Sequence, residues 1–443
     1  MPIIGLEIHV QLNTESKLFC LSKNSPLSEP NTLICEICTA QPGAKPMLPN
    51  ERAIELAYIA GNMLKCSLNS TFYFMRKHYF YPDLPSGYQR TSTPLGEKGK
   101  FMDVGITELH VEEDPGRYEL RKGLVDYNRA GVPLIEIVTE PDMGSAEEAE
   151  KFLRELERGL KYYGIIKKDG TVKVDANISI EGHERVEVKN INSFENVATA
   201  LSYEIRRQEE MIGRGEEPAR ETRHFDEAKG ITKSLRKKET ELDYRYMPDP
   251  DLYPVTYDTS SLTFPERPWE RAERFISTYG IDEKTASILT QELALADLMD
   301  YLAGSLDAKK SANWLKGPFK KQLNYRELSV ASSKLSKEDI RELASLYFEG
   351  KLSDDAMEKI LIEMLDKGGK PQEIAEKRDL FKMEDDALLP PVKKVIEENE
   401  KAVEDFKNGE EKALSFLVGK VMQLTRGKAD PKKAADIIRK LLS

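Results

Sequence analysis

The chain changes character at a proline-rich stretch, and this change limits the folds open to it. From residue 246 to residue 268 the sequence reads YMPDPDLYPVTYDTSSLTFPERP. Proline lacks a backbone N–H and fixes φ, so this stretch excludes both a helix interior and a central strand. Short polar/apolar alternations before it predict strands, whereas helical spacing dominates after it. The sequence therefore predicts a domain boundary near residue 268.

The part before the boundary predicts an α+β domain built on an antiparallel sheet. Strand-like runs such as GLEIHVQL and VPLIEIV are interrupted by Gly, Pro and Asn and do not alternate regularly with helices. Regular alternation would be needed for a parallel sheet. Helices are expected at about 51–64, 146–163 and 192–213, and Ser145 followed by acidic residues predicts an N-cap for the second.

The part after the boundary predicts an all-α region. Apolar spacing indicates helices at 269–279, 283–302, 311–323, 337–349 and 353–367, with more to the end of the chain. DKGGKPQE, residues 366–373, combines a helix stop with a proline restart. We therefore expect three domains: a catalytic domain at 1–268, a helical domain at 269–370 and a small helical tail at 371–443.

Composition excludes several classes of protein. A net charge of −11 argues against nucleic-acid binding by the whole surface. No apolar run reaches the ~18 residues of a membrane span, and four cysteines do not make a disulfide scaffold. The first residues, MPIIGLEIHVQL, lack the basic segment of a secretory signal, so we expect a cytoplasmic protein with neither membrane nor DNA as a partner.

The C-terminal tail departs from the acidic average. From Lys407 to Ser443 there are nine Lys/Arg against four Asp/Glu. A basic tail on an acidic protein is a candidate RNA-binding element. The alternative is an ordinary solvated helix surface.

Several predicted strands carry polar residues on one face. In GLEIHVQL, Glu7 and His9 alternate with apolar residues, and Glu136 interrupts the apolar run VPLIEIV. Each row alone could be the wet face of a strand. Together the rows supply Glu7, His9, Glu113, Glu136, Asp175 and Glu187, with Lys77 and Lys189 as balancing cations. Oxygen ligands with one imidazole suit Mg²⁺ or Mn²⁺, and such a site suits phosphoryl transfer.

Three cysteines form a separate candidate site. Cys20, Cys35 and Cys38 have the spacing C-x₁₄-C-x₂-C, and Ser22 stands where a fourth cysteine would be expected. A closed structural zinc site needs four ligands. Two interpretations remain: a structural Zn²⁺ with a fourth ligand from elsewhere, or three ordinary buried thiols.

Eight motifs in order resemble those of the B subunits of glutamyl/aspartyl-tRNA amidotransferases. Between Gly5 and Leu252 they read GLEIHVQL, KHYFYPDLPSGYQ, GITELHVEEDPG, LVDYNRAGVPLIEIVTEPD, VDANISI, EVKNINSF, ETRHFDE and DYRYMPDPDL. The C-terminal AVEDFKNGEEKALSFLVGKVMQLTRGKADP resembles the tail of the same subunit, so the resemblance spans nearly the whole chain. The resemblance implies a cradle-shaped N-terminal catalytic domain, then a helical domain and a helical tail that grips tRNA.

The resemblance also implies an activity. ATP would phosphorylate the side-chain carboxylate of Glu-tRNA(Gln) or Asp-tRNA(Asn), and ammonia from an amidase partner, the A subunit, would displace the phosphate; a small C subunit completes the complex. It implies Mg²⁺ ligands at His9, Glu113 and Glu136, with Glu7, Asp175, Glu187 and Lys189 as catalytic residues and Lys77 and Tyr81 at ATP. Relatives with the zinc knuckle usually have a cysteine where this chain has Ser22.

Two other functions compete with this hypothesis. A stand-alone carboxylate–amine ligase would explain the acidic residues but not the helical half and the basic tail. A non-catalytic protein that binds tRNA or assists assembly would explain the tail and make the acidic residues solvated strand faces. Only the amidotransferase makes ATP turnover depend on a misacylated tRNA.

Overall fold

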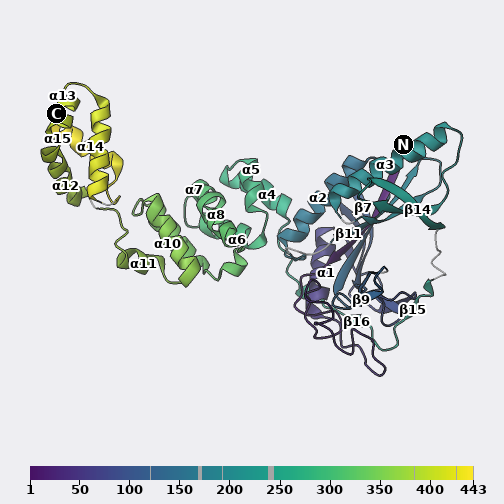
Figure 1. The fold of residues 1–443 in the computed structure, drawn as a ribbon. Helices are drawn as coiled ribbons and strands as arrows, with labels where there is room; N and C mark the ends of the chain where they lie inside the picture. Colours follow the sequence, from purple (N-terminus) through teal and green to yellow (C-terminus); the bar gives the residue numbers. More distant parts are fainter. Residues whose placement is uncertain are drawn as a thin grey trace. The chain divides into compact units, whose positions relative to one another are not determined.

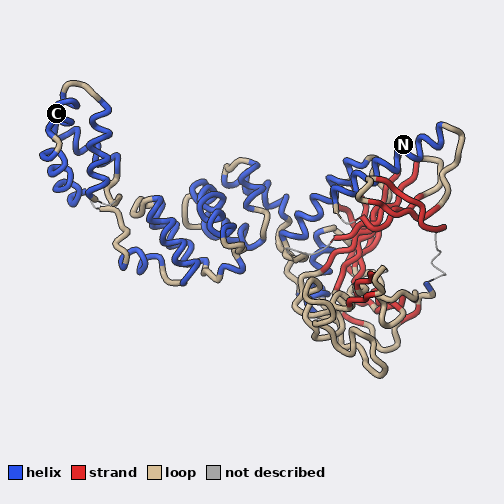
Figure 2. The backbone as a smooth tube through the Cα atoms, in the orientation of Figure 1, coloured by secondary structure: helices blue, strands red, loops and turns tan. Residues whose placement is uncertain are grey.

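The computed structural model describes residues 1–119, 121–167, 172–191, 193–237, 244–383, 385–425 and 427–442. It divides into two compact units, Met1–Pro268 and Trp269–Ser443. Strands lie in the first unit and the second is helical (Figures 1 and 2), which confirms the predicted α+β class with a helical C-terminal part. Arg426 and Ser443 of the predicted basic tail lie outside the described residues.

The first unit contains a large sheet, two small two-stranded sheets and three helices. Its strands are β1 (Pro2–Gln11), β2 (Ser67–Leu68), β3 (Thr71–Phe72), β4 (Phe74–His78), β5 (Tyr88–Ser92), β6 (Gly96–Phe101), β7 (Val104–Glu113), β8 (Arg117–Glu119), β9 (Leu124–Asp126), β10 (Pro133–Thr139), β11 (Val172–Ile180), β12 (Val186–Ile191), β13 (Glu221–Asp226), β14 (Ile231–Lys237), β15 (Met247–Pro248) and β16 (Val255–Thr256). Its helices are α1 (Glu51–Met63), α2 (Ala146–Tyr162) and α3 (Phe194–Gly213), with a short 3₁₀ turn, η2 (Thr259–Ser261).

The large sheet has twelve strands in the order β14-β13-β12-β11-β1-β10-β7-β5-β4-β15, with β6 and β2 branching from β7. All its pairs are antiparallel except β12 with β13. β1 is central, paired with β10 on one side and β11 on the other. The N-terminal strand therefore positions residues from both halves of the sheet.

Helices cover one face of this sheet (Figure 1). α1 contacts β6, β7 and β10, and α3 contacts β11, β12 and β14. The apolar row of β1, which includes Ile4, Leu6 and Ile8, is buried under them, because alternate side chains of a strand point to one face. Ser145 accepts a hydrogen bond from the backbone N–H of Glu148 and caps α2, as its sequence predicts.

The second unit consists of helices joined by short loops. They are α4 (Pro268–Tyr279), α5 (Glu283–Leu289), α6 (Leu293–Ala303), α7 (Ala308–Trp314), a π turn η3 (Leu315–Phe319), α8 (Lys320–Tyr325), η4 (Ala331–Ser333), α9 (Lys337–Phe348), α10 (Asp354–Lys367), α11 (Pro371–Lys377), α12 (Asp385–Glu398), α13 (Glu400–Lys407), α14 (Glu411–Leu424) and α15 (Pro431–Leu442). Within the described residues, no helix combines the length and apolarity needed to cross a membrane.

The last helices of this unit enclose a small apolar core of their own. α12 contributes Leu388 and Val392, α14 contributes Leu417 and Val421, and α15 contributes Ile438, all fully buried. The described basic residues of the tail therefore belong to a packed group of helices rather than to an extended segment.

Asp300 on α6 ties α4 to α6. It accepts hydrogen bonds from Arg271 at 2.7 Å, Arg274 at 2.9 Å and the Tyr279 hydroxyl at 2.6 Å. Burial acts to raise the pKa of Asp300, but the hydrogen bonds from Arg274, Tyr279 and Arg271 outweigh it and lower the pKa to about 2. The ionised carboxylate is therefore the form that the fold stabilises.

We expect Asp300→Asn to lower the free energy of unfolding by about 1–2 kcal/mol at pH 7, a figure discounted because Asp300 is partly exposed. A carboxyl whose pKa falls on folding contributes above its unfolded pKa, and the contribution is lost as the pH falls through about 2. The difference in unfolding free energy between the variant and the wild type should therefore shrink below about pH 4. Urea unfolding between pH 3 and 8 measures this difference.

Asp297→Asn is the control, because Asp297 also pairs with Arg271 but is 60% exposed. Equal effects of the two substitutions on the unfolding free energy would contradict the role of Asp300.

Candidate active site

The sheet face opposite the helices carries a continuous polar row. In the register of the central strands, Glu7 of β1 pairs with Asp175 of β11, and His9 pairs with Glu136 of β10. Their neighbours in sequence, Leu6, Ile8 and Val10, point into the core. Antiparallel pairing therefore gathers, on one face, polar residues that are up to 170 positions apart in the chain.

His9, Glu112 and Glu136 form the most compact cluster in this row. His9 Nε2 lies 3.7 Å from Glu112 Oε2 and 3.6 Å from Glu136 Oε1. One ligand atom from each of the three residues lies within 4.8 Å of the other two. Two carboxylates and one imidazole are a donor set that fits a hard divalent cation such as Mg²⁺ or Mn²⁺.

The electrostatics of Glu112 favour a cation at this cluster. Burial, and then the charge of Glu136, raise the pKa of Glu112, while His9 and Lys77 act to lower it. The side chain of Glu112 is only 4% exposed. Two carboxylates so close together and so poorly hydrated repel each other, and a bound cation would relieve this repulsion.

The structure does not bring Glu113, which the sequence predicted as a Mg²⁺ ligand, to His9 and Glu136. Glu113 shares the opposite face of β7 with Val111, because consecutive residues of a strand point to opposite faces. Its carboxylate accepts hydrogen bonds from the backbone N–H of Arg90 at 3.1 Å and from the Arg90 guanidinium at 3.3 Å. Glu112 occupies the place in the cluster that was expected for Glu113.

The four predicted catalytic residues lie together on the neighbouring strands. Lys189 of β12 contacts Asp175 at 2.9 Å and Glu187 at 3.2 Å. Glu7 accepts a hydrogen bond from Asn177 at 3.3 Å. Burial acts to lower the pKa of Lys189, but Asp175, Glu187 and Glu7 outweigh it and raise the pKa. Lys189 is therefore a fixed positive charge among three carboxylates.

Lys77 and Tyr81, the predicted ATP contacts, differ in their surroundings. Lys77 of β4 lies at the edge of the metal cluster: burial acts to lower its pKa, but Glu112, Tyr246 and Glu136 raise it. Its ammonium also lies 4.8 Å from the centre of the Tyr244 ring. Tyr81 is 53% exposed. Lys77 thus belongs to the cluster, whereas Tyr81 stands on an open loop.

The three predicted zinc ligands also come together. The sulfur atoms of Cys20, Cys35 and Cys38 lie within 4.8 Å of one another. Cys38 accepts hydrogen bonds from the buried Lys17 ammonium at 3.3 Å and from the backbone N–H of Cys35 at 3.2 Å. The hydrogen bond with Cys20, then these two groups, lower the pKa of Cys38 to about 4 against the effect of burial.

This cysteine cluster does not fit a closed structural zinc site. Such a site takes four nitrogen or sulfur ligands. The described residues supply three, and the further side chains that contact Cys38 are the Lys17 ammonium and the Ser22 hydroxyl. A cation there would also meet the positive charge of Lys17. Zinc binding at this cluster stays a prediction.

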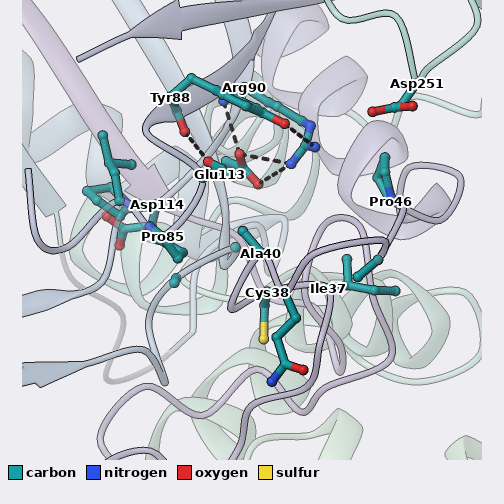
Figure 3. Close-up of a pocket in the computed structure, with 17 residues that line it drawn as sticks. Ile37, Cys38, Ala40, Pro46, Pro85, Tyr88, Arg90, Glu113, Asp114 and Asp251 are labelled. Atoms are coloured by element: carbon teal, nitrogen blue, oxygen red, sulfur yellow. Dashed lines mark hydrogen bonds and ion pairs between the residues drawn. The ribbon is translucent and has the colours of Figure 1, made fainter. Parts of the chain in front are cut away.

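A pocket of about 240 Å³ separates the cysteine-containing loop from the far face of β7. Figure 3 shows Tyr88, Arg90 and Glu113 on one side of it and Ile37 and Cys38 on the other. Arg90 contacts both Tyr88 and Glu113. The strand β7 therefore presents one glutamate to the metal cluster and the next one to this pocket.

Sequence reasoning missed several residues of the site. The alternation of LHVEE already places Glu112 with His110 and Glu113 with Val111, so the glutamate that lies beside His9 could have been found by counting. Gln89, which donates to Glu112 at 3.1 Å, carries no comparable signal. Tyr244 and Tyr246 come from a distant proline-rich segment, so their contact with Lys77 depends on tertiary structure.

Comparisons with known proteins agree with the motifs. A family model described as the GatB/GatE catalytic domain matches residues 2–263, and one described as the GatB domain matches residues 297–442. The B subunit of the aspartyl/glutamyl-tRNA(Asn/Gln) amidotransferase of Methanothermobacter thermautotrophicus is 48% identical over 444 residues, which cover 98% of this chain and 99% of the relative. The B subunit of the same name from Methanocaldococcus jannaschii is 45% identical over 458 residues, covering 99% of this chain and 97% of the relative. The resemblance predicted from the motifs is confirmed.

The geometry predicts that Glu112→Gln weakens Mn²⁺ binding at least about tenfold, since it removes one of the three clustered ligands. Glu113→Gln should leave Mn²⁺ affinity near that of the wild type. Electron paramagnetic resonance of free Mn²⁺ measures both, with circular dichroism as the check on folding. Loss of Mn²⁺ binding in Glu113→Gln alone would contradict the assignment to Glu112.

Proposed function

Because the chain belongs to the family of aspartyl/glutamyl-tRNA(Asn/Gln) amidotransferase B subunits, we propose that it catalyses the ATP-dependent activation and amidation of misacylated Glu-tRNA(Gln), Asp-tRNA(Asn) or both. The observation that carries the proposal is the cluster of His9, Glu112 and Glu136 beside Lys77. It would combine a divalent-cation site with the half-buried ammonium of Lys77, and phosphoryl transfer to a carboxylate depends on such positive charges.

The proposed reaction has two steps. The side-chain carboxylate of the glutamyl or aspartyl group attacks the γ-phosphorus of ATP, ADP leaves, and an acyl phosphate forms. Ammonia then attacks the acyl carbon, phosphate leaves, and the nitrogen gives up a proton to yield the amide. The first step overcomes the poor reactivity of a carboxylate, whose oxygen is a bad leaving group.

The residues divide into two groups along the polar row. His9, Glu112 and Glu136 would hold Mg²⁺, which when bound would neutralise charge on phosphate oxygens. Lys77 provides a fixed positive charge beside that position, and Tyr81 on its open loop is proposed to contact ATP. Lys189, held by Asp175 and Glu187, provides a second positive charge, and Glu7 lies with them.

We propose the partners from the names of the relatives and from the chemistry. An amidase partner, the A subunit, would release ammonia from glutamine, and a small C subunit would complete the complex. The acceptor is the misacylated tRNA, so the protein would work in the cytoplasm with the translation machinery. We propose residues 1–268 as the catalytic domain, 269–370 as the helical domain and 371–443 as the tRNA-binding tail.

Reconstitution tests the activity. The chain is mixed with its amidase and small partner subunits, glutamine, ATP and each misacylated tRNA in turn, and the aminoacyl group is analysed after hydrolysis. We expect amide formation with at least one tRNA, and ATP turnover that depends on it. Turnover with free glutamate would favour a stand-alone ligase, and tRNA binding without turnover would favour a non-catalytic role; either result would refute the proposal.

The basic tail generates a separate prediction. Lys420 on α14 and Lys432 on α15 are exposed. We expect Lys420→Gln/Lys432→Gln to weaken tRNA binding and to reduce the salt dependence of affinity by about one phosphate contact per effective lysine. Fluorescence anisotropy at several salt concentrations measures it. The control is Lys151→Gln/Lys161→Gln on α2, also exposed; a loss of equal size in both double variants would refute a specific role for the tail.

A further inference from the structure

A proline-rich segment, residues 244–252, runs along the sheet edge next to Lys77; we call it the strap. Its sequence is YRYMPDPDL, part of a motif that so far identified only the family and a domain boundary. Met247 and Pro248 form β15 and pair with Arg76 and Met75 of β4. The strap therefore lies beside the strand that carries Lys77.

Asp249 anchors the strap in the sheet. Its side chain is fully buried and accepts hydrogen bonds from the Arg76 guanidinium at 2.9 and 3.0 Å and from Arg90 at 2.7 Å. Its backbone N–H donates to Phe74 at 2.8 Å. Burial acts to raise the pKa of Asp249, but Arg76, the N–H of Asp251 and Arg90 lower it, so the carboxylate stays ionised.

The anchor matters because the pairing of the strap with β4 covers only two residues. Pro248 and Pro250 have no N–H to donate. Arg245 has a φ of 43°, an unfavourable value for a residue with a side chain, and its carbonyl oxygen lies 3.0 Å from His78 Nδ1. Side-chain contacts therefore add to this short backbone pairing in holding the strap in place.

The other end of the strap surrounds the Lys77 ammonium. The Tyr244 ring centre lies 4.8 Å from Lys77 Nζ, and Tyr246 and Lys77 influence each other electrostatically: each shifts the pKa of the other. Tyr79 packs edge-on against Tyr244 at 6.3 Å. Aromatic rings attract an ammonium, and together they restrict a flexible four-carbon side chain to one position.

Arg90 connects this anchor to Glu113. Besides Asp249, Arg90 binds Glu113 through both its backbone N–H and its guanidinium. Glu113 is adjacent to the proposed metal ligand Glu112 on β7. The strap is thus attached to β7, the strand that carries Glu112 of the His9, Glu112 and Glu136 cluster.

We propose that Asp249 is a positioning residue: by anchoring the strap to Arg76 and Arg90, it places Tyr244 and Tyr246 on Lys77 and fixes that ammonium beside Glu112 and Glu136. What Lys77 does there rests on the proposed function, whereas the mechanical link between Asp249 and Lys77 does not. An asparagine at 249 would keep one acceptor oxygen and lose the charge, leaving two buried guanidinium groups with one anion fewer.

Two measurements that need no activity test the link. The first is tryptic cleavage after Arg245, an exposed residue, followed as the peptide ending at that position. The second is brief acetylation of the folded protein with acetic anhydride, with Lys77 labelling measured by mass spectrometry against other lysines. Asp249→Asn should raise the rate of cleavage after Arg245 and the rate of Lys77 acetylation at least about tenfold each, because the strap would open locally far more often.

Two further variants distinguish the anchoring of the strap by Asp249 from the contact between Tyr246 and Lys77. Tyr246→Phe keeps the anchor and removes the hydroxyl that interacts with Lys77, so Lys77 labelling should rise while cleavage after Arg245 stays at the wild-type rate. Asp258→Asn is the matched control: Asp258 caps η2, and asparagine caps equally well, so neither rate should change.

Three results would overturn the proposal: a folded Asp249→Asn with wild-type cleavage, the same variant with wild-type labelling, or Tyr246→Phe with unchanged Lys77 labelling. If Asp249→Asn does not fold, Arg76→Gln is the milder variant, since Arg90 would still hold Asp249, and the same criteria apply. In the reconstituted complex, Asp249→Asn should raise KM for ATP more than it lowers kcat. Absence of amidation by the wild type would refute the proposed function and leave the labelling result to decide the role of Asp249.

Discussion

The registers of β1 with β10 and with β11 are the constraint on which the rest of the site depends. They place His9 opposite Glu136 and Glu7 opposite Asp175. A slip of one residue would turn these charges toward the helices and expose Ile8 and Val10, because strand side chains alternate with period two. The burial of the apolar row therefore fixes the polar row, and the hydrophobic effect orients the charged groups.

Each group of carboxylates on the polar row has a lysine beside it that offsets part of its negative charge. The polar row places carboxylates side by side, and each group of them includes a cation: Lys77 beside Glu112 and Glu136, and Lys189 beside Asp175 and Glu187. Both lysines are held in the charged form by these neighbours. An anionic substrate is repelled by so acidic a surface, so the proposed phosphoryl transfer would depend on these two ammonium groups.

Local patterns in the sequence predicted much of the fold. The alternating runs became strands, and α1, α2 and α3 lie within about two residues of their expected bounds. The expected helix at 283–302 is two helices, because Thr290 bonds back to Ala286 and the chain turns before Leu293. The expected helix at 311–323 contains the π turn η3, which accommodates Pro318 without an N–H.

The site was predictable only where strand alternation determines it. His9, Glu136, Asp175, Glu187 and Lys189 follow from alternation, and counting along β7 would have selected Glu112 rather than Glu113. The contact between Asp249 and Arg90 joins residues 159 positions apart through a loop without regular structure. No periodicity encodes such a contact, because the burial of a single carboxylate between two arginines depends on the complete fold.

The strap also forms one end strand of the large sheet. β15 and β14 are the two ends of the strand order, and an end strand offers unpaired N–H and C=O groups to any other strand that approaches. At the β15 end, Pro248 and Pro250 remove two donors that an incoming strand would need. At the β14 end, the sequence ITKSLRK supplies positive charges, and Lys233 is exposed. These features disfavour pairing with another strand at both of these ends, and at one end the segment involved is the same one that contacts Lys77.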